Sequence, residues 1–348
     1  MGKLLRIGGF AAITFLPLIA SAHEVYVLPH DTIASAMTQP PLQIFDIISD
    51  NMGQFFFWAF ICVWAVLTVL SISLSKGVER ALDPTLARLK RYAPPVARVT
   101  LGLAVAASGY FGAMFGPELP FTDFVPAQLI PLFSYFLMGA GALLIVGLFT
   151  RVISGLLALL YLGMWAHYGV YMLTYANYFG EILVSLIVGN AAFAMDRYIH
   201  HMYPHVFHKL LTWMEQHAFL ILRIAFGTSL IFASAYAKFL HAQLAIETVT
   251  LYHLTDYFPF SPPFIVLGAF AIELLAGIFI VLGIEIRFAS LFLLFWLTLS
   301  LLYFGEAVWP HVVLFGVAIA LFMHGYDRYT LQWGIMRMRN KRALEPVL

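Results

Sequence analysis

RIAFGTSLIFASAYAKFL, residues 223–240, opens on an arginine and continues without another charged residue until Lys238. Together with the apolar residues from 218 onward, it is long enough for a membrane-spanning helix, which takes about 20 mostly apolar residues. Similar runs recur along the chain of 348 residues, of which 62% are hydrophobic and only 11% charged. A soluble domain carries about 25% charged residues. The composition therefore predicts an all-α, polytopic membrane protein.

Nine apolar runs after residue 52 have, or approach, the length of a membrane-spanning helix. Their predicted ranges are 53–75, 97–115, 130–149, 152–174, 180–196, 218–240, 264–284, 287–304 and 309–325. An odd number of spans places the two ends of the mature chain on opposite sides of the membrane.

The first 22 residues have the pattern of a secretory signal peptide. Lys3 and Arg6 precede an apolar run of 13 residues (7–19), which is too short to span a bilayer, and the small residues ASA (20–22) follow. We expect cleavage after Ala22. The mature chain would then begin at His23, outside the cytoplasmic membrane, with residues 23–52 as a periplasmic N-terminal segment.

The charges support this orientation. With the N-terminus outside, every Lys and Arg except Lys238 falls in a loop or end expected on the cytoplasmic side, where such residues are in excess. The loops expected outside carry acidic residues instead: Glu118, Asp123, Glu247, Asp256 and Glu306. The pattern favours a multi-pass protein of the bacterial inner membrane with a periplasmic N-terminus and a cytoplasmic C-terminus.

Three short segments occur twice in the same order. RVTLG (98–102) matches RIAFG (223–227), GLFTR (147–151) matches GIEIR (283–287), and MDRY (195–198) matches YDRY (326–329). Both copies begin inside, so they are predicted to be parallel repeats related by a pseudo-twofold axis along the membrane normal. We therefore expect two four-helix units, 97–198 and 218–331, after one extra transmembrane helix (53–75). Residues 76–96 and 199–217 would be cytoplasmic linkers, and 332–348 a cytoplasmic tail.

The second unit resembles the DoxX family of small four-helix membrane proteins. The resemblance lies in RIAFGTSLIFASAYAKFL (223–240), AIELLAGIFIVLGIEIR (271–287) and WPHVVLFGVAIALFMHGYDRYTL (309–331). The first unit is similar in GAGALLIVGLFTR (139–151) and in its closing MDRY, but it lacks the polar landmarks of the second. The resemblance implies a membrane component of quinone-linked redox systems. It carries over no shared set of catalytic residues.

Ionisable residues inside the second unit form the main candidate site. Lys238 lies 15 residues after Arg223 in one span, roughly 22 Å toward the outer face, and Glu273 lies near the midplane of the next span. His311 opens the last span, and Glu306 lies in the loop before it. With Tyr236 and Tyr303 at similar heights, these groups could converge on one outward-facing pocket.

Two interpretations of this set stay open. A Glu and a His that exchange protons suit quinol chemistry, because oxidation of a quinol releases two protons with its electrons. The cofactor or ligand would then be a quinone or another small molecule. In the alternative, Lys238 neutralises Glu273 and locks two helices together, or it extends toward the outer headgroups.

The first unit holds a secondary polar set of His167, Asn177 and Glu181. We expect His167 and Glu181 to pair across the turn between their spans. Asn190, deeper in the same span as Glu181, is expected to hydrogen-bond between helices.

Metal binding is a minor hypothesis. His23 with its free amine, together with His30, could chelate Cu(II). The four histidines of HHMYPHVFH (200–208) have spacings that could serve a metal, but interfacial histidines among lipid headgroups explain them better.

The single cysteine, Cys62, excludes a thiolate metal cluster within one chain, and no Gly-rich phosphate loop or basic nucleic-acid face is present. The chain is therefore predicted to bind neither nucleotide nor nucleic acid. We expect a subunit of a quinone-dependent redox complex that acts with a redox partner protein. The alternative is a non-enzymatic transporter or assembly scaffold for a small solute or metal.

The signal-peptide prediction can be tested directly. Edman sequencing of the mature protein, purified from membranes, is expected to read His-Glu-Val-Tyr. A sequence that starts at Met1 or Gly2 would contradict cleavage after Ala22.

Overall fold

The computed structural model describes residues 28, 30–189, 194–196 and 213–334. The described residues form helices joined by turns, with no β-strand among them. This confirms the predicted all-α fold class. The long helices are α3 (Phe55–Leu89), α4 (Ala93–Phe111), α5 (Ile130–Val146), α6 (Thr150–Tyr168), α7 (Ala176–Val188), α10 (Ala218–Ser234), α12 (Pro262–Leu282), α13 (Ile286–Phe304) and α14 (Val308–His324).

Each of the nine predicted spans overlaps one of these helices. Six segments are long and apolar enough to cross a membrane: Phe55–Leu74, Ala127–Val146, Thr150–Val188, Ala218–Leu240, Pro262–Leu282 and Ile286–Phe304. The segment from Thr150 to Val188 contains α6 and α7, and α14 is apolar but shorter. The fold is therefore that of a polytopic membrane protein.

Some boundaries differ from the prediction. Helix α3 continues to Leu89 through most of the range expected as a linker, because residues 76–89 contain helix formers and a single proline, Pro84. Helix α7 begins at Ala176, earlier than the predicted residue 180, and ends at Val188, where Gly189 has a φ of 46°. The expected contact of Asn190 lies outside the described residues.

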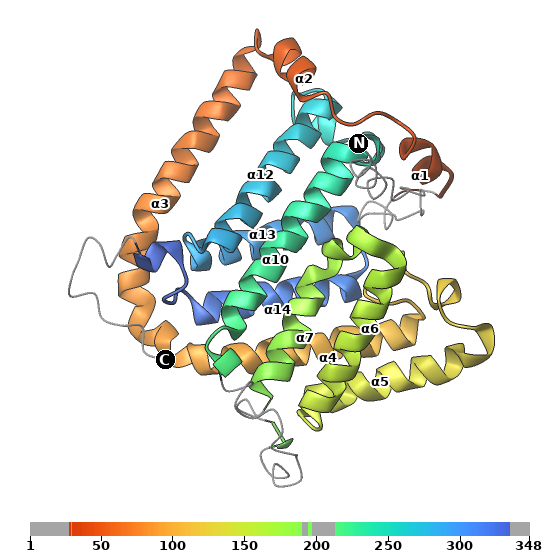
Figure 1. The fold of residues 1–348 in the computed structure, drawn as a ribbon. Coiled ribbons are helices and arrows are strands. Elements are labelled where there is room, and N and C mark those ends of the chain that lie inside the picture. Colours follow the sequence, from red (N-terminus) through yellow and green to blue (C-terminus); the bar gives the residue numbers. More distant parts are fainter. Residues whose placement is uncertain (1–27, 29, 190–193, 197–212, 335–348) are drawn as a thin grey trace, which may run out of the picture.

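Eight of the long helices form two rows that cross each other (Figure 1). The first row runs α12, α10, α7, α6, and the second runs α13, α14, α4, α5, with each helix packed on the next in its row. In the centre, α10 packs on α7 and α14 packs on α4. Each row thus takes two helices from the range 97–198 and two from the range 218–331.

Paired glycines allow the closest helix contacts. A Cβ atom on Gly102 of α4 would lie 2.8 Å from the Gly141 carbonyl oxygen of α5. A Cβ atom on Gly227 of α10 would lie 2.7 Å from the Gly277 carbonyl oxygen of α12. Small residues at such positions let backbones approach in a bilayer, where lipid supplies no hydrophobic drive between helices. The two helix pairs therefore use the same packing device.

The turns before α6 and α13 also share one backbone path. Gly147 and Phe149 have φ values of 75° and 53°, and Gly283 and Glu285 have φ values of 69° and 48°. The two glycines lie against the guanidinium groups of Arg98 and Arg223, respectively, so that a larger residue would collide with them. Only glycine combines this left-handed conformation with the space that the arginines need.

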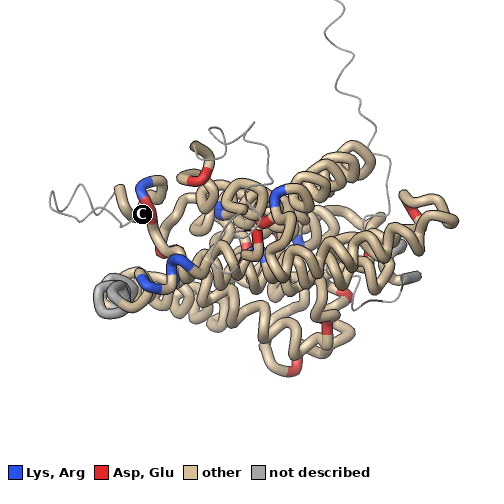
Figure 2. The backbone as a smooth tube through the Cα atoms, turned by 90° about the horizontal axis from the view of Figure 1, so that it is seen from below, with Lys and Arg blue, Asp and Glu red and all other residues tan. Residues whose placement is uncertain are grey.

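Basic residues gather at one end of the helical rows, which we call the basic end and define by Arg98, Arg151, Arg223 and Arg287. Figure 2 shows most Lys and Arg residues toward one side of the molecule. The turn between α13 and α14, which contains Glu306, lies at the opposite end.

The remaining elements lie around the rows. Helix α3 packs against α14 and, through Phe57 and Phe60, against Phe264 of α12. The short helices α2 (Ile44–Asn51) and α11 (Ala242–Leu251) pack on α12, and α1 (His30–Ala36) packs on α11. Helix α11 also packs on the π-helical turn η8 (Ala235–Leu240), which continues α10.

The glycine contact between α10 and α12 generates a stability prediction. We expect Gly227→Ala to lower the free energy of unfolding by about 1–3 kcal/mol, because its Cβ would be forced against backbone and Val281. The measurement is the melting temperature in detergent. Gly139→Ala in α5, where nothing lies within 4 Å of the added atom, is the control and should not lower it. Equal melting temperatures for wild type and Gly227→Ala would contradict the close contact.

Candidate polar site in the second unit

Lys238 and Glu273 form an ion pair inside the helical body. Lys238 lies in the π-helical turn η8, and its Nζ atom is 3.0 Å from Oε2 of Glu273 in α12. The Trp296 indole of α13 donates a hydrogen bond to the other carboxylate oxygen, Oε1, at 3.2 Å. Each side chain of the ion pair is only 18% exposed. The pair therefore lets two charges lie within a membrane-spanning segment without an isolated ion.

The π-helical turn contributes to this geometry. A π-helix accommodates an extra residue in the helical ladder, and such turns occur often at functional sites. Here the Phe239 carbonyl accepts a hydrogen bond from the Leu42 amide at 2.8 Å, so a segment from outside the rows is attached next to Lys238. The π turn is a feature that the apolar pattern of 218–240 did not reveal.

Glu306 and His311 form a second pair, near the start of α14. The His311 Nε2 atom lies 2.8 Å from Glu306 Oε2, and the Ser300 hydroxyl donates to Glu306 Oε1 at 2.8 Å. The other ring nitrogen, Nδ1, is 2.7 Å from the Ala307 carbonyl oxygen. Both side chains are buried, with 3% of His311 and 10% of Glu306 exposed.

The partners of His311 determine where a proton must lie. A carbonyl oxygen can only accept, so Nδ1 carries a hydrogen that it donates to Ala307. The 2.8 Å contact between Nε2 and Glu306 then needs one further proton, held by either the imidazole or the carboxyl group. The pair can therefore hold one proton and move it between two atoms that already lie within hydrogen-bond distance.

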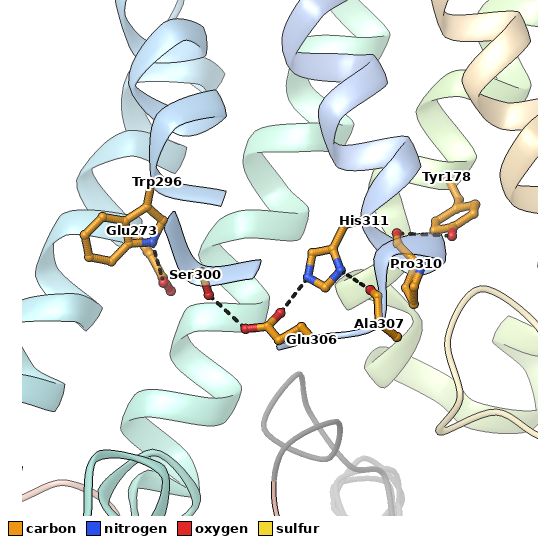
Figure 3. Close-up of polar contacts among 8 residues, drawn as sticks. All are labelled: Tyr178, Glu273, Trp296, Ser300, Glu306, Ala307, Pro310 and His311. Carbon is orange, nitrogen blue, oxygen red and sulfur yellow. Dashed lines mark hydrogen bonds and ion pairs between the residues drawn. The ribbon is translucent and has the colours of Figure 1, made fainter. Parts of the chain in front are cut away.

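Helix α13 connects the two pairs. Trp296 and Ser300 are one turn apart, which places them on the same face of the helix, and each donates to one of the two carboxylates (Figure 3). Sequence reasoning missed both donors. Their spacing of four residues in an otherwise apolar span was the available signal. We call Lys238, Glu273, Trp296, Ser300, Glu306 and His311 the polar network.

Tyr236 and Tyr303, which were predicted to line the pocket, lie beside this network. The Tyr236 ring packs 5.4 Å from the Tyr171 ring and 4.6 Å from the His241 ring. The Tyr303 hydroxyl donates to the Tyr252 carbonyl oxygen at 2.9 Å, near the connection from α11 to α12. Tyr303 thus ties α13 to that connection.

The residues expected as a secondary polar set do not form one group. The predicted pair of His167 and Glu181 does not form in the described part of the chain: Glu181 is fully buried and its Oε1 contacts the Thr100 hydroxyl at 3.0 Å, whereas His167 is exposed at the end of α6. Asn177 Oδ1 lies 3.2 Å from the Ser229 hydroxyl of α10. The predicted pairing was wrong. His167 lies on α6 and Glu181 on α7, and helical spacing alone did not show that the two side chains face different surroundings.

His167 instead borders a cleft of about 720 Å³ in the first unit. The cleft lies between α6 and the segment 122–126, and Asp123, Phe124, Met164 and Tyr168 also line it. No residue of the polar network lines this cleft.

The metal hypotheses fall mostly outside the described residues. His23 and residues 200–208 are not described, and for His30 the structure describes only its place in α1. Among the described residues, no group of three or more His, Cys, Asp or Glu side chains is placed to hold a metal ion.

Crossed rows of apolar helices with ion pairs buried between them define an all-α, multi-pass membrane protein in a lipid bilayer. Comparison with protein families is more specific: residues 218–306 match the DoxX family. The match begins with α10 and ends at Glu306, so it contains every member of the polar network except His311. A search of the curated proteins found no match to the chain, and neither did a search of the solved structures.

The ion pair generates a mutational prediction. Lys238→Met leaves Glu273 without its cation, and we expect it to lower stability by about 2–3 kcal/mol, the cost of an isolated charge within the bilayer. The double variant Lys238→Met/Glu273→Gln removes both charges, keeps an acceptor for Trp296, and should recover most of the loss. Thermal unfolding of the single and double variants in detergent measures the coupling. Strictly additive losses would contradict a direct pair.

Proposed function

We propose that this chain is a DoxX-like membrane subunit of a quinone-linked redox system, and that its second unit binds a quinone or a similar small molecule at the polar network. The observation that carries the proposal is the buried Glu306–His311 pair with its shared proton, one helical turn along α13 from the Lys238–Glu273 ion pair. The family match supports a DoxX-like membrane role for the same residues.

The chemistry of the network fits a quinol head group. A quinol presents hydroxyl groups, and its oxidation releases two protons together with two electrons. The Glu306–His311 pair places a carboxyl group and an imidazole within hydrogen-bond distance, and both groups can accept and donate protons. Glu273, kept as an anion by Lys238, offers a hydrogen-bond acceptor. A partner protein would receive the electrons, as the subunit role implies.

We further propose that the chain is a tandem of two DoxX-like units in the bacterial inner membrane, with the basic end toward the cytoplasm. The equivalent glycine contacts, the equivalent turns at Gly147 and Gly283 and the equivalent order of helices in the two rows support the tandem. The positive charges at the basic end support the orientation. The polar network would then open toward the periplasm.

Quinone content tests the proposal. Lipid extracts of the gently purified wild-type protein are expected to contain bound quinone, measured by mass spectrometry against protein concentration. Glu273→Gln and His311→Ala should each reduce the quinone-to-protein ratio several-fold, because each removes one partner of the network. Glu247→Gln in α11 and His167→Ala in α6 are matched controls outside the network and should leave the ratio unchanged.

The outcome separates the two classes of function. Absence of quinone from the wild-type extract, or equal losses in the network and control variants, would contradict quinone binding at this site. Enrichment of a metal or of another small solute in the same sample would favour the transporter or scaffold alternative.

A further inference from the structure

Glu181 lies at the junction of the two rows, away from the polar network. It belongs to α7 of the first row, and its partner Thr100 belongs to α4 of the second row. Gly316 of α14 gives Thr100 its space, since a Cβ atom there would collide with the Thr100 side chain. One residue before Glu181, Gly180 packs closely against Ala225 of α10. The carboxyl group therefore lies where four helices meet, and 0% of Glu181 is exposed.

The hydrogen bonds around Thr100 are compatible with a protonated Glu181. The Thr100 hydroxyl oxygen lies 2.9 Å from the Val96 carbonyl oxygen and 3.0 Å from Glu181 Oε1. A hydroxyl has one hydrogen, and a carbonyl oxygen can only accept. The hydroxyl can donate that hydrogen to Glu181, or it can donate to Val96 and accept a hydrogen from a protonated Glu181 carboxyl group. The second carboxyl oxygen, Oε2, is buried and has no hydrogen-bond partner among the described residues.

Among the described residues, no basic group forms an ion pair with Glu181. Thr100 provides the one hydrogen bond to its side chain in the described part of the chain. Basic side chains on the four helices that pack on α7 lie toward the helix ends and have other contacts or face outward; they are Arg98, Arg151, Arg223, His167, His311 and His324. A carboxylate in this position would be an isolated charge inside the bilayer, which membrane proteins avoid by pairing or neutralisation.

We propose that Glu181 is a proton-binding site between the two rows, a neutral carboxylic acid whose ligand is a hydrogen ion that exchanges with solvent. Buried acids of this kind mark proton pathways in membrane proteins. Tyr178, one turn away on α7, donates to the Phe115 carbonyl oxygen at 2.9 Å, and its hydroxyl lies 3.4 Å from the Pro310 carbonyl oxygen (Figure 3). The phenol thus joins the surroundings of Glu181 to the residue before His311. The site is independent of quinone binding.

Infrared spectroscopy of the purified full-length protein tests the site. The wild type is expected to show the carbonyl band of a protonated carboxylic acid, and Glu181→Gln should abolish that component. Glu273→Gln is the matched control and should retain it, because the Glu273 carboxylate is paired with Lys238. Thr100→Val, which removes the partner, should shift the band. A spectrum unchanged by Glu181→Gln would overturn the proposal.

Two further measurements keep the test decisive. Gln has the shape of a neutral Glu, so Glu181→Gln should unfold at the wild-type temperature, and Glu181→Asp should move the band without removing it if the first variant folds poorly. Transfer of the wild type into D₂O should shift the band as the proton exchanges. A band that never shifts would overturn the proposal, because Glu181 would then be a permanently neutral structural group.

Discussion

An ionisable side chain inside a lipid bilayer must be paired or neutral, and the polar groups of this protein are arranged around that constraint. A lone charge there costs at least about 2.5 kcal/mol, and a buried unpaired polar atom also carries a cost. The chain meets the constraint in three ways. Lys238 and Glu273 form an ion pair, Glu306 and His311 lie within hydrogen-bond distance of each other, and the buried Glu181 contacts the Thr100 hydroxyl. Each arrangement needs two or more helices, so helix packing and side-chain ionisation depend on each other.

Helix packing in turn depends on small residues. Gly102 and Gly141 bring α4 and α5 together, and Gly227 and Gly277 do the same for α10 and α12. The close approach of α10 and α12 brings Lys238 within ion-pair distance of Glu273, and α13 then places Trp296 and Ser300 against both carboxylates. The first unit has the same framework, but Leu137 in α5 stands where the second unit has Glu273, ten residues before the equivalent glycines Gly147 and Gly283. One unit thus holds the paired charges, while the buried acid Glu181 lies where the two rows meet.

Much of the helical order was predictable because a spanning helix has a strong compositional signal. Every predicted span overlaps a helix, and the contact of Lys238 with Glu273, which one of the two interpretations required, is present at 3.0 Å. The errors concern direction around a helix. His167 and Glu181 were expected to pair, but one is exposed and the other is buried against α4. In a helix that is apolar on all sides, the sequence has no polar face that indicates which way a residue points.

The sequence by itself determined that the chain is all-α, that it crosses a membrane repeatedly, and that Lys238, Glu273, Glu306 and His311 are its exceptional polar residues. The length of an apolar run, its apolarity and the distribution of charges are local properties of a sequence. A bilayer restricts spanning segments so strongly that these properties predict the helices directly. Only the tertiary structure decided the crossed rows, the π-helical turn at Lys238, the donors Trp296 and Ser300, and the isolation of Glu181. These features depend on contacts between residues far apart in the chain. Apolar helices of similar composition can pack in many ways, and here particular glycine contacts and polar pairs stabilise one arrangement.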